Sequence, residues 1–173
     1  FPRLAEVEAA LEEKMSKAAA EGVPVDSITF SGNGEPTMNP DFPHIVEATV
    51  RLRDRYFPQA KVSVLSNAVL VARKEIADAL KKVDNPILKI DASSDELIAK
   101  INKPVGRYRL AEIVEALKGF EGDFILQTMF LHSDDFDAHT DDALEGWRNI
   151  VRQLSPREVM VYTIEIGRAS CRE

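Results

Sequence analysis

The residues best suited to chemistry lie in one short segment, Thr29-Phe-Ser-Gly-Asn-Gly-Glu-Pro-Thr-Met-Asn-Pro40, which follows a strand-like stretch. Gly32 and Gly34 can take positive φ values and let a ligand approach the backbone, and Asn33 tolerates the left-handed region better than most residues. Glu35 projects from a turn that the following proline makes rigid. The segment therefore predicts a loop that offers backbone polar groups and one carboxylate to a ligand carrying an ammonium group.

The glycine spacing excludes two phosphate-binding motifs. The sequence contains neither Gly-x-Gly-x-x-Gly, the dinucleotide-binding pattern, nor the Gly-Lys-Ser/Thr of a P-loop. The alternative to a binding loop is a structural one, in which the two glycines only make a tight turn between a strand and a helix.

The elements that position this loop alternate along the chain. Strands separated by helices imply right-handed βαβ units and a parallel sheet. An open doubly wound sheet and a (β/α) barrel both fit this order, and periodicity does not separate them. The predicted strands cover residues 25–31, 61–67, 86–91, 124–130 and 158–164, and the helices cover 4–15, 41–56, 74–83, a short stretch after 93 or 94, 110–117 and 144–154.

Composition limits the classes of protein that fit. With 173 residues, 45% of them hydrophobic and 29% charged, the chain can form one sizeable core. No apolar run approaches the roughly 20 residues that cross a bilayer, and no signal peptide is present, so we expect no membrane contact and, by default, a cytoplasmic location. The net charge of -7 gives no support for a nucleic-acid partner. The single cysteine, Cys171, cannot hold a metal or cluster alone.

The phrase Ser-Gly-Asn-Gly-Glu-Pro-Thr resembles the Gly-Gly-Glu-Pro loop of radical S-adenosylmethionine (radical SAM) enzymes, in a form seen in a branch related to wyosine-tRNA synthesis. The resemblance extends from the first helix to Ile164. It implies a barrel that binds S-adenosylmethionine (SAM) through a 4Fe-4S cluster and cleaves it to a deoxyadenosyl radical that abstracts hydrogen from a substrate. We therefore predict an α/β fold, a partial parallel (β/α) barrel of radical SAM type that is incomplete at both ends.

The resemblance also implies roles for individual residues. The backbone from Gly32 to Glu35, including Asn33 and Gly34, should meet the methionine amino group of SAM. Ser66 and Asn67 match positions that often contact the cofactor, although either could instead cap a helix.

Two further strand residues become candidates for the cofactor site. Asp91 could accept hydrogen bonds from the ribose hydroxyls or cap the following helix. Gln127 alternates with its neighbours along a strand and is a candidate for substrate or cofactor contact, whereas Met129 is expected to be ordinary packing.

The sequence departs from the family at the cluster. The Cys-x-x-x-Cys-x-x-Cys loop should precede Phe1 and is missing, so we expect this fragment alone to be inactive. We assign residues 1–164 to the central part of the barrel. Residues 165–173 resemble the translation of a sequencing-adapter read and are interpreted as a non-native tail; the alternative is a short polar tail with an accidental thiol.

The substrate cannot be read from the residues, although the family branch implies tRNA, and the family implies flavodoxin or ferredoxin as electron donor. A barrel that only binds, without radical chemistry, is a second hypothesis. A third is a Schiff-base lyase, if Lys89 in the middle of its strand points into the barrel.

Two weaker signals receive structural interpretations. The acidic run 133–142 fails the spacing of a calcium-binding EF-hand loop and is interpreted as a solvated loop. Asp141 and Asp142, behind Thr140, should cap the next helix and complement its dipole. The three histidines, at positions 44, 132 and 139, lack metal-ligand spacing and are assigned to surface or loop positions.

Overall fold

The computed structural model describes residues 1–31, 34–104, 106–133 and 135–163. Its centre is a five-stranded sheet of order β1-β2-β3-β4-β7, in which every neighbouring pair is parallel. Each strand lies beside the strand that precedes it in this order, so the chain progresses around the sheet in one direction. The strands are Ser27–Phe30, Lys61–Ser66, Asn85–Lys89, Ile125–Met129 and Glu158–Tyr162.

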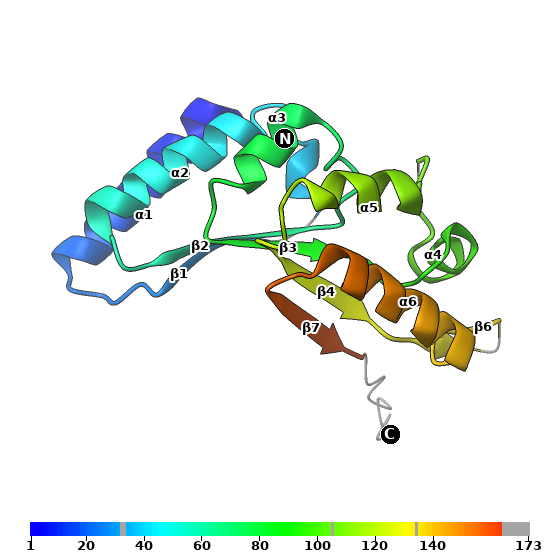
Figure 1. Ribbon diagram of the computed structural model, residues 1–173. Helices are drawn as coiled ribbons and strands as arrows, with labels where there is room; N and C mark the ends of the chain where they lie inside the picture. Colours follow the sequence, from blue (N-terminus) through cyan, green and yellow to red (C-terminus); the bar gives the residue numbers. More distant parts are fainter. Residues whose placement is uncertain (32–33, 105, 134, 164–173) are drawn as a thin grey trace, which may run out of the picture.

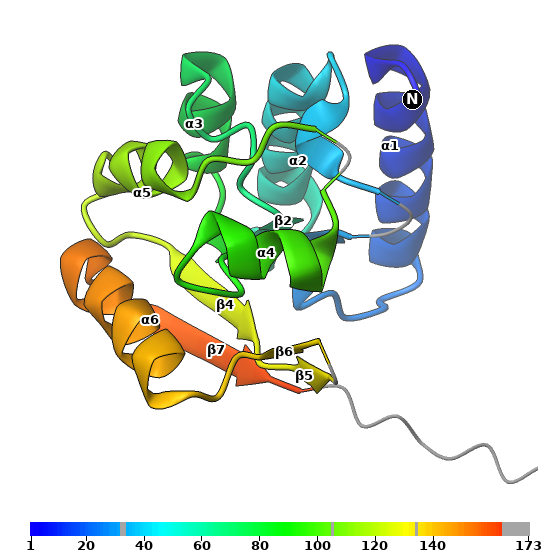
Figure 2. The same cartoon turned by 90° about the vertical axis from the view of Figure 1, so that its right-hand side faces the viewer.

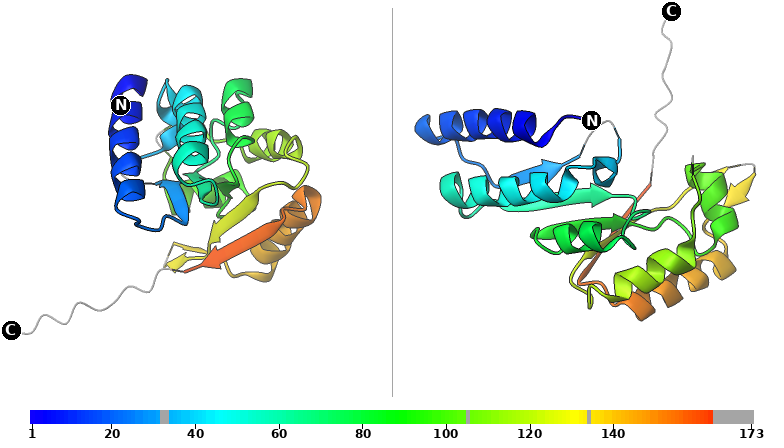
Figure 3. Two further views of the ribbon diagram at one scale, coloured as in Figure 1. Left: turned by 90° about the vertical axis from the view of Figure 1, so that its left-hand side faces the viewer. Right: turned by 90° about the horizontal axis from the view of Figure 1, so that it is seen from above.

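Helices connect the strands and cover one face of the sheet. Figure 2 shows α1, α2, α3, α5 and α6 in an arc on one side of the strands, and Figure 3 shows the same arc from the opposite end. Because one-way progression with right-handed crossovers places the connecting helices on one side, this is the predicted partial barrel rather than a doubly wound sheet. The helices are α1 Leu4–Ala20, η1 Pro36–Met38, α2 Phe42–Tyr56, α3 Lys74–Leu80, α4 Asp95–Asn102, α5 Leu110–Lys118 and α6 Asp141–Leu154.

The core lies between the sheet and these helices. Val64, Leu88 and Leu126 come from three adjacent strands and are fully buried, in one cluster with Leu80 of α3 and Leu117 of α5. Burying such side chains contributes about 1.5–3 kcal/mol each. The alternation of strand residues sends their neighbours to the opposite, inner face of the sheet.

The inner face carries a row of side chains that the strand register aligns. Lys89 of β3 lies opposite Gln127 of β4, and Gln127 lies opposite Met160 of β7. β7 is the edge strand of the described sheet, and its apolar residues Val161 and Tyr162 are 55% and 39% exposed. No described helix is long and apolar enough to cross a membrane.

Most predicted elements are present, with differences at their ends. The helix predicted over 74–83 ends at Leu80, and β3 begins one residue earlier than predicted and ends at Lys89. The acidic loop contains a two-stranded hairpin, β5 His132–Ser133 paired with β6 Phe136–Asp137, which periodicity cannot reveal in strands of two residues. The tail 165–173 lies outside the described residues.

The carboxyl ends of the strands point to the side of the molecule where α4 and the β5–β6 hairpin lie (Figure 1). α4 begins as expected with the cap Ser94, whose side chain accepts a hydrogen bond from Leu97 N at 3.2 Å. α6 is capped by Thr140, whose side chain accepts from Ala143 N at 3.3 Å, and the predicted caps Asp141 and Asp142 lie instead in its first turn. These caps satisfy backbone N–H groups that a helix start otherwise leaves without partners. Polar residues at strand ends therefore gather at this edge.

Candidate functional site

The loop after β1 begins the site. Gly32 and Asn33 lie outside the described residues, so their predicted contact with a ligand stays a prediction. Gly34 has φ +131°, a conformation that only glycine adopts easily, and a side chain added there would meet no atom within 4 Å. The need for glycine here is therefore conformational, and the space beside its backbone is open.

Glu35 joins this loop to the end of β2. Its Oε1 accepts hydrogen bonds from Thr37 N at 3.1 Å, Thr37 Oγ1 at 2.6 Å and Ser66 Oγ at 2.8 Å, while Oε2 accepts from Asn67 N at 2.7 Å. An ionised carboxylate has about four acceptor positions, so most of its capacity is used inside the protein. The side chain thus fixes the loop, and the backbone of the loop is the part left to face a ligand.

Ser66 and Asn67 shape the turn after β2. The buried hydroxyl of Ser66 also accepts from Ala68 N at 3.1 Å, and Asn67 Oδ1 accepts from Val69 N at 3.0 Å. The alternative prediction, a helix cap, is wrong for both residues, because α3 begins at Lys74 after the turn. Both residues do belong to the same cluster as Glu35, which places three of the predicted positions side by side.

Asp91, just beyond β3, is fully buried. Its Oδ1 accepts from Met129 N at 2.8 Å, and its Oδ2 lies 2.8 Å from both Asn102 Nδ2 and Lys89 Nζ. The capping alternative is wrong here too, since Ser94 caps α4. Asp91 therefore ties β3, β4 and α4 together, and a ribose hydroxyl would have to displace one of these partners to reach it.

Tyr108 lies close to this network. Burial raises the pKa of its hydroxyl, and the nearby carboxylates of Asp91 and Asp95 raise it further. The buried hydroxyl has no hydrogen-bond partner among the described residues. No sequence pattern indicated this residue. Tyr108 lies between α4 and α5, and only the tertiary fold brings it near Asp91.

Lys89 and Gln127 lie side by side on the inner face. Lys89 Nζ lies 2.8 Å from a carboxylate oxygen of the buried Asp91, so the amine that a Schiff-base lyase would use is already paired within the protein. Gln127 is partly buried, and Met129 is buried as expected of a packing residue. Gln127 thus faces the concave side of the sheet as predicted, with its contact to a ligand untested.

The histidines occupy surface and loop positions. His44 lies 3.8 Å from Glu47, and in the hairpin the ring of His139 lies 5.9 Å from that of His132 and 3.1 Å from Asp137 Oδ1. The His139 backbone N–H lowers the pKa of Asp137, with a smaller contribution from the His139 ring. Within the described ranges no group of three His, Cys, Asp or Glu residues is arranged to hold a metal ion.

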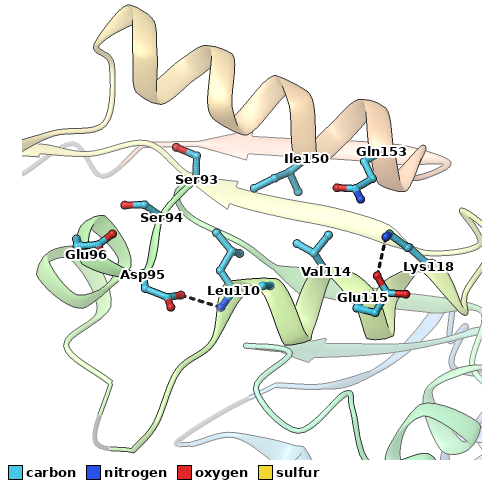
Figure 4. A pocket seen from close by; sticks show the side chains of 11 residues that line it. Ser93, Ser94, Asp95, Glu96, Leu110, Val114, Glu115, Lys118, Ile150 and Gln153 are labelled. Atoms are coloured by element: carbon cyan, nitrogen blue, oxygen red, sulfur yellow. Dashed lines mark hydrogen bonds and ion pairs between the residues drawn. The ribbon is translucent and has the colours of Figure 1, made fainter.

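Two hollows lie on the described surface near α4. Figure 4 shows the first, a groove of about 490 Å³ whose lining residues lie on or next to α4, α5 and α6; Leu110, Val114 and Ile150 form its apolar part. The residues that line it include none of the predicted site residues. The second, of about 530 Å³, includes Glu35 and Asn67 in its wall, so it adjoins the loop and the turn after β2.

The described residues fit the two cofactors implied by the resemblance unequally. Gly34 offers an open backbone approach beside a fixed loop, which fits a ligand such as SAM. No described group of residues fits an iron–sulfur cluster, which requires thiolate ligands, and Cys171 lies outside the described residues. The site built by this part of the chain is therefore a candidate for SAM alone.

Comparisons with known proteins agree with this geometry. The family model described as the radical SAM superfamily matches residues 3–145. A UPF0026 protein of Synechocystis sp. is 30% identical over 141 residues, which cover 79% of this chain and 49% of that protein. One from Methanocaldococcus jannaschii is 26% identical over 157 residues, covering 88% and 46%. The chain thus spans about half the length of these curated relatives.

A solved structure gives an independent comparison of the fold. The crystal structure of archaeal TYW1 matches 91% of this chain, and 52% of that chain, with a TM-score of 0.55 and 14% sequence identity. At this identity the likeness concerns the fold alone, and it agrees with the partial barrel described above.

Proposed function

Because this chain belongs to the radical SAM superfamily, we propose that it supplies the part of the SAM site formed by the loop after β1 and the end of β2. In this proposal the backbone from Gly32 to Glu35 meets the methionine amino group, and Ser66 and Asn67 hold the side chain of Glu35. The whole protein carries out the reaction characteristic of the superfamily, reductive cleavage of SAM. The iron–sulfur chemistry is assigned to no described residue.

The observation that carries the proposal is the set of hydrogen bonds around Glu35. The carboxylate accepts one bond from Ser66 Oγ and one from Asn67 N, although these residues lie 31 and 32 positions away in sequence. Because Glu35 is held in this way, less conformational entropy is lost at this residue when a ligand binds beside it. A Cβ built at Gly34 would meet no atom within 4 Å, so the described structure leaves the backbone of Gly34 open to a ligand.

The remaining predicted positions have supporting roles in this proposal. Asp91 lies just beyond the carboxyl end of β3, where the ribose would lie. Gln127 lies on the inner face of β4, where the substrate would lie. The substrate and the electron donor follow from family analogy: we propose tRNA and a flavodoxin or ferredoxin, respectively. Fold-level analogy is weak support for a substrate, so each needs its own binding measurement.

The proposal is tested by titrating this chain with SAM and following its backbone amides by NMR. We expect the signals of Gly34 and Asn67 to shift, and Glu35→Gln to weaken binding by about tenfold because an amide nitrogen cannot accept the bonds that a carboxylate oxygen accepts. Glu115→Gln is the matched control, since Glu115 is 73% exposed on α5. Unchanged affinity in Glu35→Gln, or no shift at either amide, would contradict the proposal.

A further inference from the structure

The pocket beside Glu35 is assembled from three separate segments. One wall is Met38 of η1, the second is the turn from Asn67 to Arg73, and the third is formed by Pro104, Gly106 and Arg107. Figure 2 shows the third segment leaving α4 and running toward α5 across the carboxyl side of the fold. The volume of about 530 Å³ falls within the roughly 300–1,000 Å³ typical of small-molecule sites.

Apolar side chains form much of the pocket wall. Val69, Leu70 and Pro104 line it, and Met38 adds a thioether side chain that is 58% exposed. Leu70 also packs against the main core, so this part of the wall is held by the fold. A thioether and a proline ring suit a planar or hydrocarbon surface, which predicts a ligand with an apolar body.

Two guanidinium side chains add positive charge. Arg73 forms no ion pair within the described part of the chain, whereas Arg107 lies 3.1 Å from Glu112, with both side chains mostly exposed. Exposed pairs of this kind contribute little to stability, so the Arg107 guanidinium can exchange Glu112 for a ligand at little cost. The one carboxylate in the wall, Glu35, already accepts four hydrogen bonds from its own surroundings.

We propose that this pocket binds an organic phosphate, with the phosphate between Arg73 and Arg107 and the organic body against Met38, Leu70 and Pro104. A phosphate dianion matches two cations, whereas a carboxylate brings a single charge, and the guanidinium fork pairs well with phosphate oxygens. SAM carries no phosphate, so this ligand is additional to the proposed cofactor. The two sites share only Glu35 and Asn67 as wall residues.

The test compares three probes that separate the two parts of the predicted ligand: phenyl phosphate, inorganic phosphate and phenol. Each is titrated into this chain, and binding is followed by the shifts of backbone amides in NMR spectra. Phenyl phosphate should bind more tightly than either of the other two, because only phenyl phosphate uses the apolar wall and the guanidinium groups together. Equal affinity for phenyl phosphate and inorganic phosphate would overturn the proposal.

Substitutions then locate the binding. Arg73→Gln and Arg107→Gln should each lower the affinity for phenyl phosphate by about tenfold, because each loses one charge-assisted hydrogen bond. Met38→Ala should lower the affinity for phenyl phosphate but leave the affinity for inorganic phosphate unchanged. Arg148→Gln is the control, because Arg148 is 55% exposed on α6. If Arg148→Gln weakens binding as much as Arg73→Gln, the phosphate responds to overall charge and the pocket assignment is wrong.

Competition with SAM separates this inference from the proposed function. Saturating SAM should leave the phenyl phosphate affinity within about twofold, since the two sites share only Glu35 and Asn67 and the phosphate is held by Arg73 and Arg107. If SAM displaces phenyl phosphate completely, the pocket is part of the SAM site and the phosphate proposal fails while the SAM proposal stands.

Discussion

Replacing Asp84 with Asn should lower the free energy of unfolding by about 2 kcal/mol at pH 7. Asp84 follows α3 and ties the amino ends of two strands to α2: its carboxylate accepts from Val62 N at 2.9 Å and Arg53 Nη1 at 2.6 Å and lies 3.2 Å from Lys61 Nζ. Burial raises its pKa, but these three donors outweigh burial and lower the pKa from 3.8 to about 2. The difference of about 1.8, at 1.36 kcal/mol for each pKa unit, gives the expected loss.

The same shift fixes the pH dependence. Because the pKa of Asp84 is lower in the folded protein than in the unfolded chain, its stabilisation is fully present above pH 3.8 and is lost as the pH falls through about 2. The difference between the parent protein and Asp84→Asn should therefore shrink from about 2 kcal/mol at pH 7 to about 1 kcal/mol at pH 3.

Urea unfolding of both proteins at the two pH values measures this difference. Asp54→Asn is the matched control: Asp54 pairs with the same arginine, Arg53, at 2.6 Å but is 61% exposed, so its loss should stay below about 0.5 kcal/mol. A loss for Asp84→Asn that equals the control at pH 7, or that does not change between pH 7 and pH 3, would refute the reasoning.

Three further substitutions probe buried polar groups. Trp147→Phe should cost about 1 kcal/mol, because the indole N–H donates to the buried Thr128 hydroxyl at 2.9 Å, and urea midpoints at constant slope would report the loss. Tyr108→Phe should leave the same midpoint unchanged or raise it, since its buried hydroxyl has no described partner; a clear decrease would reveal a bond that the structure lacks. Asp91→Asn should lower the free energy of unfolding by about 3 kcal/mol, because it leaves the Lys89 charge without its partner. Adding Lys89→Met should recover part of that loss in a double-mutant cycle, and no recovery would show that the pair is not coupled.

The order of elements could be predicted because it depends on local patterns. Apolar periodicity located five parallel strands and the helices between them, and a short polar residue located the cap Ser94. For α6 the prediction chose Asp141 and Asp142, whereas the cap is Thr140. Element ends were less certain. The β5–β6 hairpin was missed because two-residue strands have no measurable period. The backbone bond from Ala138 N to Leu131 O, at 3.1 Å, closes the hairpin only in the folded chain.

The candidate site was predicted as a set of residues but not as a structure. The loop sequence identified Glu35, and strand ends identified Ser66, Asn67 and Asp91, yet their partners were assigned only in part. Asp91 neither caps a helix nor stands free: it lies in a buried network with Asn102, which is 11 residues away in sequence. These hydrogen-bond partners depend on how α4 packs against the end of β3, and no spacing in the sequence predicts that packing.

By itself, the sequence determined that this chain forms parallel βα units with a glycine loop of radical SAM type at a strand end. These features depend on local properties of the sequence. Examples are the backbone freedom of Gly34 and the alternation of apolar residues in strands. The tertiary structure alone decided that Glu35 uses its carboxylate to hold Ser66 and Asn67, and that Lys89 neutralises Asp91. The fold brings the loop after β1 beside the end of β2 and buries Asp91, and a buried carboxylate is stable only when such partners surround it.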